Sequence, residues 1–202
     1  KLQVVLTGDS NKSLIHQTLD LIHEIDVAQG VAFDTAYFDR LIERDFLDPI
    51  NYYRRGLAHL SSGNADQAYL DFEQTSRLGV EFLDLRANKA YALLQAGDLS
   101  SYGELAGLVK GNPRNPQFHA YLAEIQMALG DRALLLAGTR ENIGVSRTAE
   151  YGSALSNSER AKLLAPDFGL PYLIQARIFA NIGESDFAEG LINDSARLAL
   201  PT

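Results

Sequence analysis

A recurring pattern of small, glycine and polar positions divides the apolar residues of this chain into helical segments. In GLAHLSSGNADQA, residues 56–68, a small residue and a glycine are separated by six positions, and a polar residue follows the glycine. The same phrase recurs in residues 90–98, 123–131 and 176–184. Around each glycine the apolar residues recur every three or four positions, which is the period of an α-helix. The pattern predicts antiparallel helix pairs, with each glycine in a left-handed conformation at the turn.

The spacing of these glycines is nearly constant in the middle of the chain. Gly63 and Gly97 are 34 residues apart, and Gly97 and Gly130 are 33 apart. A period of 34 residues is typical of one class of helical solenoid. Residues 51–78 resemble the tetratricopeptide repeat (TPR) family, because the large, small, turn, small and large residues of that repeat are matched by Tyr52, Gly56, Gly63, Ala68 and Phe72. The phrases at 46–49 and 163–166 are similar to the Leu-Asp-Pro that closes such repeats.

The resemblance covers about residues 12–200 and implies an all-α fold, namely a right-handed superhelical α-solenoid of about five antiparallel helix pairs. We expect an extended N-terminal segment at 1–11 and a TPR-like repeat domain at 12–202. The approximate units of that domain are 12–49, 50–81, 82–115, 116–167 and 168–200. Residues 1–6 alternate like a strand, and they are interpreted as a chain end lying against the first helix or as a strand added to another chain.

Several positions depart from the family pattern. Arg55 and Lys89 stand where the family places Leu, and Tyr102 and Ala106 stand where small and large residues are expected. A related helical repeat with similar spacing is therefore the alternative. Charged groups such as Asp39 with its neighbour Arg40 are interpreted as ordinary helix-surface charges.

One interval between glycines is too long for a single repeat. Gly130 and Gly183 are 53 residues apart, which is 19 more than a repeat of 34. We therefore expect an insertion near 131–147, with a short helix near 132–142 and a longer helix near 148–164. In solenoids such insertions lie in loops on one face.

Composition and charge narrow the class of partner. The chain has 202 residues, of which 46% are apolar, so it can bury a core without metal or disulfide. It has no cysteine, which excludes disulfides and thiolate sites but does not fix the compartment. The net charge of -8 argues against nucleic acid or an anionic membrane as the partner.

No apolar run approaches the roughly 20 residues that span a bilayer. Because the sequence begins at Lys1 rather than Met, we also consider a processed chain.

The titratable residues do not form a recognisable catalytic or metal site. His16, Asp20 and His23 share one helical face and could hold a transition metal, but we interpret them as a solvated stripe beside apolar positions. His59 and His119 lack a nearby nucleophile or orienting carboxylate in the sequence, and we interpret them as surface or packing residues. We therefore expect no enzyme activity, no metal and no cofactor.

The resemblance implies a concave groove lined by the first helix of each pair. The groove positions lie three before and one after the small residue, so they are four apart on one helical face. The expected partner-binding residues are Tyr53, Leu57, Ala87, Asn88, Tyr91, Ala120, Tyr121, Glu124 and Arg177, with Leu173 at the first position of the last repeat. Only Asn88 matches the family's Lys, Asn and Arg clamp for a C-terminal carboxylate, so that ligand is not expected. The tyrosines could instead pack inside the solenoid, and the sequence leaves this alternative open.

These features favour a protein-protein interaction scaffold or adaptor that binds a partner segment in a mostly apolar groove. A bacterial secretion or envelope-assembly system is one setting for such a protein, and the sequence leaves the cytoplasm and the periplasm both open. The first alternative is a self-assembling module whose end repeats stack on another copy. The second is an enzyme, which fits less well because no nucleophile, base and orienting group occur together in the sequence.

Overall fold

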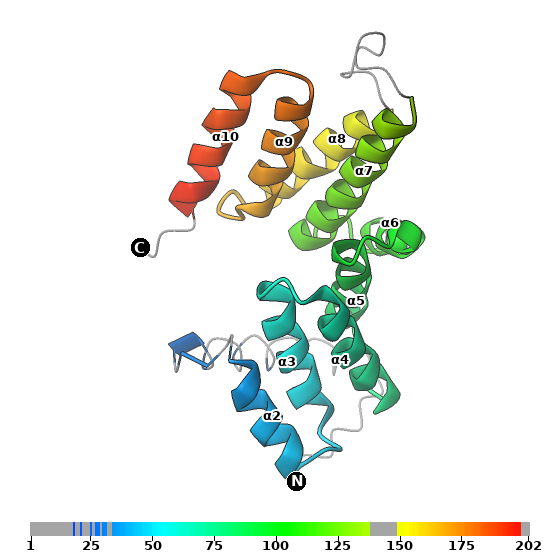
Figure 1. The fold of residues 1–202 in the computed structure, drawn as a ribbon, viewed down its shortest axis with the longest axis vertical. Helices are drawn as coiled ribbons and strands as arrows, with labels where there is room; N and C mark the ends of the chain where they lie inside the picture. Colours follow the sequence, from blue (N-terminus) through cyan, green and yellow to red (C-terminus); the bar gives the residue numbers. More distant parts are fainter. Residues whose placement is uncertain are drawn as a thin grey trace. The chain divides into compact units, whose positions relative to one another are not determined.

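The computed structural model describes residues 34–137 and 149–198, together with seven single positions between Thr18 and Val31. The predicted extended segment at 1–11 and the triad of His16, Asp20 and His23 lie outside the described residues. The described residues form helices joined by turns, without strands (Figure 1). The chain divides into two compact units, Lys1–Ala96 and Gly97–Thr202, which are described one at a time.

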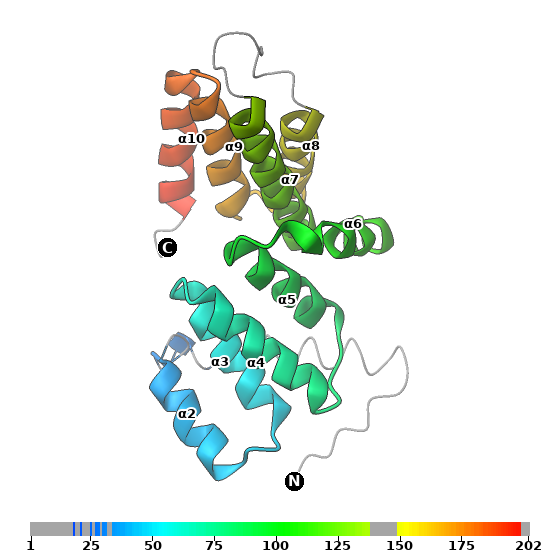
Figure 2. The same cartoon turned by 45° about the vertical axis from the view of Figure 1, so that its right-hand side comes forward.

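The first unit contains four described α-helices that pack in chain order. They are α2 (Thr35–Arg44), α3 (Pro49–Ser61), α4 (Ala65–Arg77) and α5 (Leu83–Gln95). Each packs against the next, and α3 also contacts α5 (Figure 2). The Leu-Asp-Pro phrase begins α3, because the Asp48 side chain accepts a hydrogen bond from the Ile50 amide at 2.9 Å and Pro49 is the first helical residue. Gly63 has a φ of 76° between α3 and α4, so the left-handed turn predicted there is confirmed.

The core of the first unit forms where α3, α4 and α5 meet. It contains Tyr53, Ala68, Phe72, Leu85 and Ala92, all of them buried. The helices α3 and α4 approach closely at Gly56, where an added Cβ would lie 2.6 Å from an atom of the Phe72 ring. The small and large positions of the sequence pattern therefore face each other across the pair.

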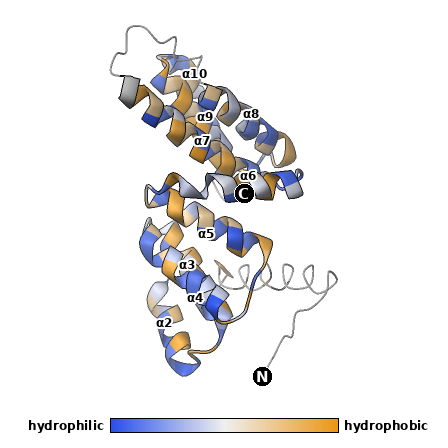
Figure 3. Ribbon diagram, turned by 90° about the vertical axis from the view of Figure 1, so that its right-hand side faces the viewer, coloured by the Kyte–Doolittle hydropathy of each residue, from blue (hydrophilic) through white to orange (hydrophobic). Residues whose placement is uncertain are grey.

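The second unit contains the remaining described helices. They are the 3-10 helix η1 (Leu99–Ser101) and the α-helices α6 (Tyr102–Gly111), α7 (Pro116–Ala137), α8 (Ala149–Leu164), α9 (Leu170–Asn181) and α10 (Ser185–Leu198). Each α-helix packs against the next, and α7 also contacts α9. Buried residues of α7, α8 and α9 form the core of this unit, and they are Ala123, Met127, Tyr151, Ala154, Ile174 and Ile178. Figure 3 shows hydrophobic and hydrophilic positions interspersed along the helices of both units.

The turn predicted at Gly130 is wrong. Gly130 lies inside α7, which continues to Ala137, and its φ is not positive. A Cβ at Gly130 would lie 2.5 Å from Cδ1 of Tyr151, so this glycine permits close contact between α7 and α8 instead of reversing the chain. The separate short helix predicted near 132–142 is also wrong, because residues 131–137 continue α7. The longer helix predicted near 148–164 is confirmed by α8, and residues 138–148 lie outside the described residues.

The helix pair α9–α10 repeats the pair α3–α4, and equivalent residues of the two pairs are 120 positions apart in the sequence. The Tyr52 hydroxyl donates to the Phe46 carbonyl at 3.1 Å, and the Tyr172 hydroxyl donates to the Pro166 carbonyl at 2.9 Å. A second bond recurs at the same offset, from Thr75 Oγ1 to the Pro49 carbonyl at 3.3 Å and from Ser195 Oγ to the Gly169 carbonyl at 3.2 Å. The repeat predicted from the glycine spacing is therefore present in the hydrogen bonds, whereas the unit boundaries stay a prediction.

Substitution of Gly130 tests its close approach to Tyr151. In Gly130→Ala the new Cβ would overlap the ring, so we expect a loss of about 1–3 kcal/mol of unfolding free energy, the usual cost of overpacking. Gly152→Ala is the matched control, because Gly152 is also helical and no neighbouring atom lies within 4 Å of an added Cβ. The control should be neutral or stabilising, since Ala is the better helix former. Urea unfolding measures both variants, and equal stabilities would contradict the contact.

Candidate partner-binding surface

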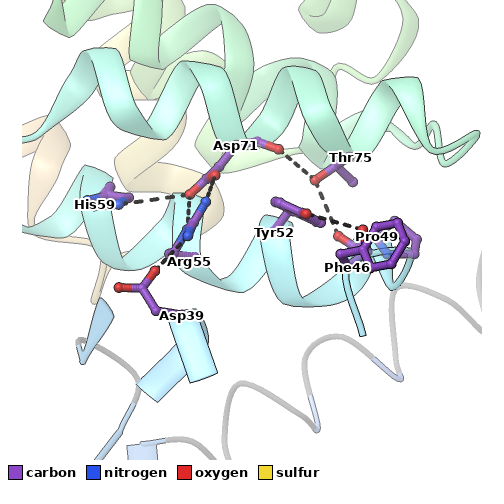
Figure 4. Close-up of polar contacts among 8 residues, drawn as sticks. All are labelled: Asp39, Phe46, Pro49, Tyr52, Arg55, His59, Asp71 and Thr75. Carbon is purple, nitrogen blue, oxygen red and sulfur yellow. Dashed lines mark hydrogen bonds and ion pairs between the residues drawn. The ribbon is translucent and has the colours of Figure 1, made fainter. Parts of the chain in front are cut away.

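An ion cluster joins three helices of the first unit at Arg55, one of the positions that departs from the family pattern (Figure 4). Its guanidinium donates to the Asp71 carboxylate at 2.8 and 2.6 Å and to Asp39 at 2.6 Å. The hydrogen bond to Asp71 is the main cause that raises the pKa of Arg55. Asp71 is buried, and His59 Nε2 lies 3.9 Å from its carboxylate. The cluster therefore holds α2, α3 and α4 together, and Asp39 is more than an ordinary surface charge.

Lys89 occupies the equivalent position in the next repeat and has a similar role. Its ammonium lies 2.5 Å from the Glu73 carboxylate, so the pair links α5 to α4. The hydrogen bond from Lys89 is the largest of the effects that lower the pKa of Glu73. Both departures from the family's Leu thus form ion pairs between neighbouring helices.

In the first unit, the candidate groove residues lie at two different depths. Tyr53 is 6% exposed, Asn88 is 2% exposed and Ala87 is fully buried. The Asn88 amide donates to the Tyr53 hydroxyl at 3.0 Å, so these two polar groups satisfy each other inside the core. Leu57 and Tyr91 are half-buried, and they are the candidates of this unit with accessible surface.

The candidates of the second unit separate in the same way. Ala120 is fully buried and Tyr121 is 6% exposed, with its hydroxyl accepting a hydrogen bond from the Gln117 amide at 2.7 Å. Glu124 is half-buried and Arg177 is exposed. Leu57, Tyr91, Glu124 and Arg177 all follow the small position of their repeats, and we call them the outer row. The residues three before the small position are buried in the first three repeats, whereas Leu173 is exposed.

Arg177 belongs to a polar network that the sequence interpretation missed. Its guanidinium lies 2.7 Å from Asp131, whose carboxylate also accepts hydrogen bonds from the Tyr151 hydroxyl at 2.5 Å and the Asn181 amide at 2.9 Å. Burial, followed by the hydrogen bond to Asp131, raises the pKa of Tyr151 to about 12. The network joins α7, α8 and α9, and it was missed because Asp131 was assigned to a turn.

His119 is a buried residue held by two contacts of its ring nitrogens. His119 is 7% exposed, and its ring nitrogens lie 2.9 Å from Asn157 Oδ1 and 3.0 Å from the Pro113 carbonyl oxygen. Within the described part of the chain, no group of three or more His, Cys, Asp or Glu residues could hold a metal ion. Within the same residues, no helix is both long and apolar enough to cross a membrane.

Comparison with known proteins identifies the fold. No protein-family description matches the sequence, and no curated protein matches it. Among solved structures, TTC0263, a thermophilic TPR protein of Thermus thermophilus, is similar with a TM-score of 0.62 and 23% identity over 75% of this chain and 74% of that one. MamA from Desulfovibrio magneticus RS-1, residues 41 to the end, is similar with a TM-score of 0.53 and 14% identity over 96% and 97%. The predicted fold class, an all-α solenoid of TPR-like helix pairs, is confirmed.

Removal of Arg55 tests the ion cluster. Arg55→Met leaves the buried Asp71 carboxylate without its main cation, so we expect a loss of about 3 kcal/mol in unfolding free energy. Combining it with Asp71→Leu should recover most of this loss, because no unpaired charge then remains buried. Arg40→Met, on the exposed side of α2, is the control and should be within about 0.5 kcal/mol of wild type. A harmless Arg55→Met would show that the cluster does not stabilise the fold.

The raised pKa of Tyr151 makes the unfolding free energy depend on pH in the alkaline range. Its pKa is raised from 10.0 to about 12, so the folded protein favours the neutral phenol. This contribution is complete below pH 10, the unfolded pKa, and is lost as the pH rises towards 12. Between these pH values, unfolding free energy from urea titrations should fall less steeply for Tyr151→Phe than for wild type. Tyr102→Phe, at an exposed tyrosine, should follow wild type, and a Tyr151→Phe profile parallel to wild type would refute the assignment.

Proposed function

We propose that this protein is an interaction scaffold that binds an extended or helical segment of a partner protein on the outer-row residues of its first unit, Leu57 and Tyr91. Helical repeats stack into extended surfaces that suit this role. The observation that carries the proposal is the partial exposure of Leu57 and Tyr91 next to buried residues of the same helices. The cellular system, for which we considered bacterial secretion or envelope assembly, stays a prediction.

The proposed surface on the first unit is apolar. Leu57 lies on α3 and packs against the core cluster, while Tyr91 lies at the equivalent position of α5. Beneath them, Tyr53 and Asn88 are held by their hydrogen bond, so the helices that carry the two accessible residues are fixed before a partner arrives. A preformed surface avoids the entropy cost of ordering contact residues during binding.

The outer-row residues of the second unit are charged, and they are not part of the surface proposed on the first unit. Glu124 is half-buried on α7, and Arg177 is exposed on α9 with its guanidinium bound to Asp131. Because Asp131 already neutralises Arg177, an acidic group of a partner would compete with an internal carboxylate. The proposal therefore assigns most of the binding energy to the apolar residues of the first unit and little to Arg177.

Substitutions in the outer row test this function. The partner is first recovered by crosslinking pull-down. We expect Tyr91→Ala and Leu57→Glu each to weaken its binding by about 2 kcal/mol or more. Tyr91→Ala removes an aromatic anchor of the kind that dominates interfaces, and Leu57→Glu introduces a carboxylate that is costly to desolvate. Tyr102→Ala and Leu70→Glu are the matched controls, since both positions are exposed and lie on α6 and α4. The controls should bind as wild type does in calorimetric titration.

The variants must be folded for this comparison. Circular dichroism and thermal melts establish that Tyr91→Ala and Leu57→Glu keep the helical content and cooperative unfolding of wild type. If folded variants bind the partner with unchanged affinity, the outer row of the first unit is not the binding surface. If the two controls weaken binding instead, the partner uses the second helices of the pairs.

A further inference from the structure

One buried hydrogen bond links the two helices that carry the proposed binding residues. Within the first unit, Leu57 lies on α3 and Tyr91 lies on α5. The Asn88 amide donates to the Tyr53 hydroxyl at 3.0 Å, and both residues are buried. Tyr53 comes four residues before Leu57, and Asn88 comes three residues before Tyr91. The bond therefore joins α3 to α5 about one helical turn from the proposed surface.

The ring of Tyr53 is held in place by other aromatic rings. It lies 5.0 Å from the ring of Phe82, edge to face, and 5.7 Å from the ring of Phe72, both between centroids. Phe72 is itself fully buried against Gly56, where an added Cβ would lie 2.6 Å from its ring. Because the Tyr53 ring is packed in this way, its hydroxyl is a fixed acceptor, and the bond to Asn88 sets the position of α5 against α3.

We propose that the bond between Tyr53 and Asn88 fixes the separation of the two surface residues and thereby selects extended partner segments with two apolar residues three positions apart. This role rests on the function proposed above. The helices α3 and α5 are in contact, and the axes of packed helices lie about 8–10 Å apart. A polyproline II segment rises about 3.1 Å per residue with three residues per turn, so residues three apart lie about 9 Å apart on one side. A β-strand would place such residues on opposite sides.

Peptides of defined spacing test this selection. The probes are short proline-rich peptides that differ only in the number of positions between their two leucines. In titrations followed by protein NMR, the peptide with leucines three positions apart should bind wild type about tenfold more tightly than the others, because a mismatched spacing leaves one leucine in water. A helical alanine-rich peptide with leucines seven positions apart spans a similar distance. Tighter binding of that helix would overturn the selection of an extended segment.

Removal of the hydrogen bond distinguishes positioning from stability. Tyr53→Phe combined with Asn88→Leu removes both members of the bond, so neither is left buried without the other, and the double variant should unfold as cooperatively as wild type. Its preference among the peptides should fall to about twofold or less. Tyr52→Phe is the matched control, because this neighbouring tyrosine of α3 donates to the Phe46 carbonyl and not to α5. The control should keep the preference of wild type.

Spin labels measure the separation of the two helices directly. The chain has no cysteine, so Ser61→Cys and Gln95→Cys introduce the only two labelling sites. Both residues are exposed, and they lie in the last turns of α3 and α5, each four positions after a residue of the proposed surface. Electron paramagnetic resonance should give a narrow distance distribution in the otherwise wild-type protein. The distribution should broaden in the double variant and stay unchanged in the control.

The outcomes distinguish the positioning role from the proposed surface. Absence of binding by every peptide would contradict the surface itself, and the positioning role with it. Binding without a preference for spacing, or a preference that survives in the double variant, would overturn the positioning role alone. An unchanged distance distribution in the double variant would do the same. If the double variant does not fold, Tyr53→Phe alone carries the test, since it removes only the hydroxyl.

Discussion

Two helix pairs of this protein depend on a contact between a residue without a side chain and an aromatic ring. Gly56 receives the ring of Phe72 within α3–α4, and Gly130 receives the ring of Tyr151 within α7–α8. Any Cβ at these glycines would overlap the ring, so the distance between the two helices is set by the absence of one carbon atom. Further core contacts are built on this distance, including that of Tyr53 with the Phe72 ring at 5.7 Å between centroids.

Glycine has two physical roles in this fold, and the sequence pattern distinguished them in only part of the chain. At Gly63, Gly97 and Gly183 the backbone has a positive φ, as the repeated phrase predicted. At Gly130 the same phrase occurs, but the glycine is helical and serves as the small partner of an aromatic ring. The residues after Gly130 continue with good helix formers, which is a signal for an uninterrupted helix. The helical period predicted the fold class, while the role of this glycine required knowing which ring it faces.

The departures from the family pattern are explained by contacts between neighbouring helices, which the sequence of a single repeat does not show. Arg55 and Lys89 replace an apolar residue, and each finds a carboxylate 16 positions away on α4. The sequence marks these positions as unusual, yet the pairing depends on how α4 is rotated between its two neighbours. The same limitation applies to Asp131, whose partners Tyr151 and Arg177 lie on two other helices. Compensating charges are thus determined by the contact between helices, which a linear pattern does not specify.

The burial of the candidate binding residues also depends on contacts between neighbouring helices. They lie on the first helices of the pairs, as the sequence predicted, but the sequence did not separate buried Tyr53 and Ala87 from half-buried Leu57 and Tyr91. Positions three before the small residue are buried where the adjacent helices cover them, as α5 covers Tyr53. Leu173 occupies this position too, yet it is exposed, and within the described residues no helix follows its pair. Whether a repeat position belongs to the core or to the surface is therefore decided by the neighbouring helix pair, and the same apolar side chain can serve either purpose.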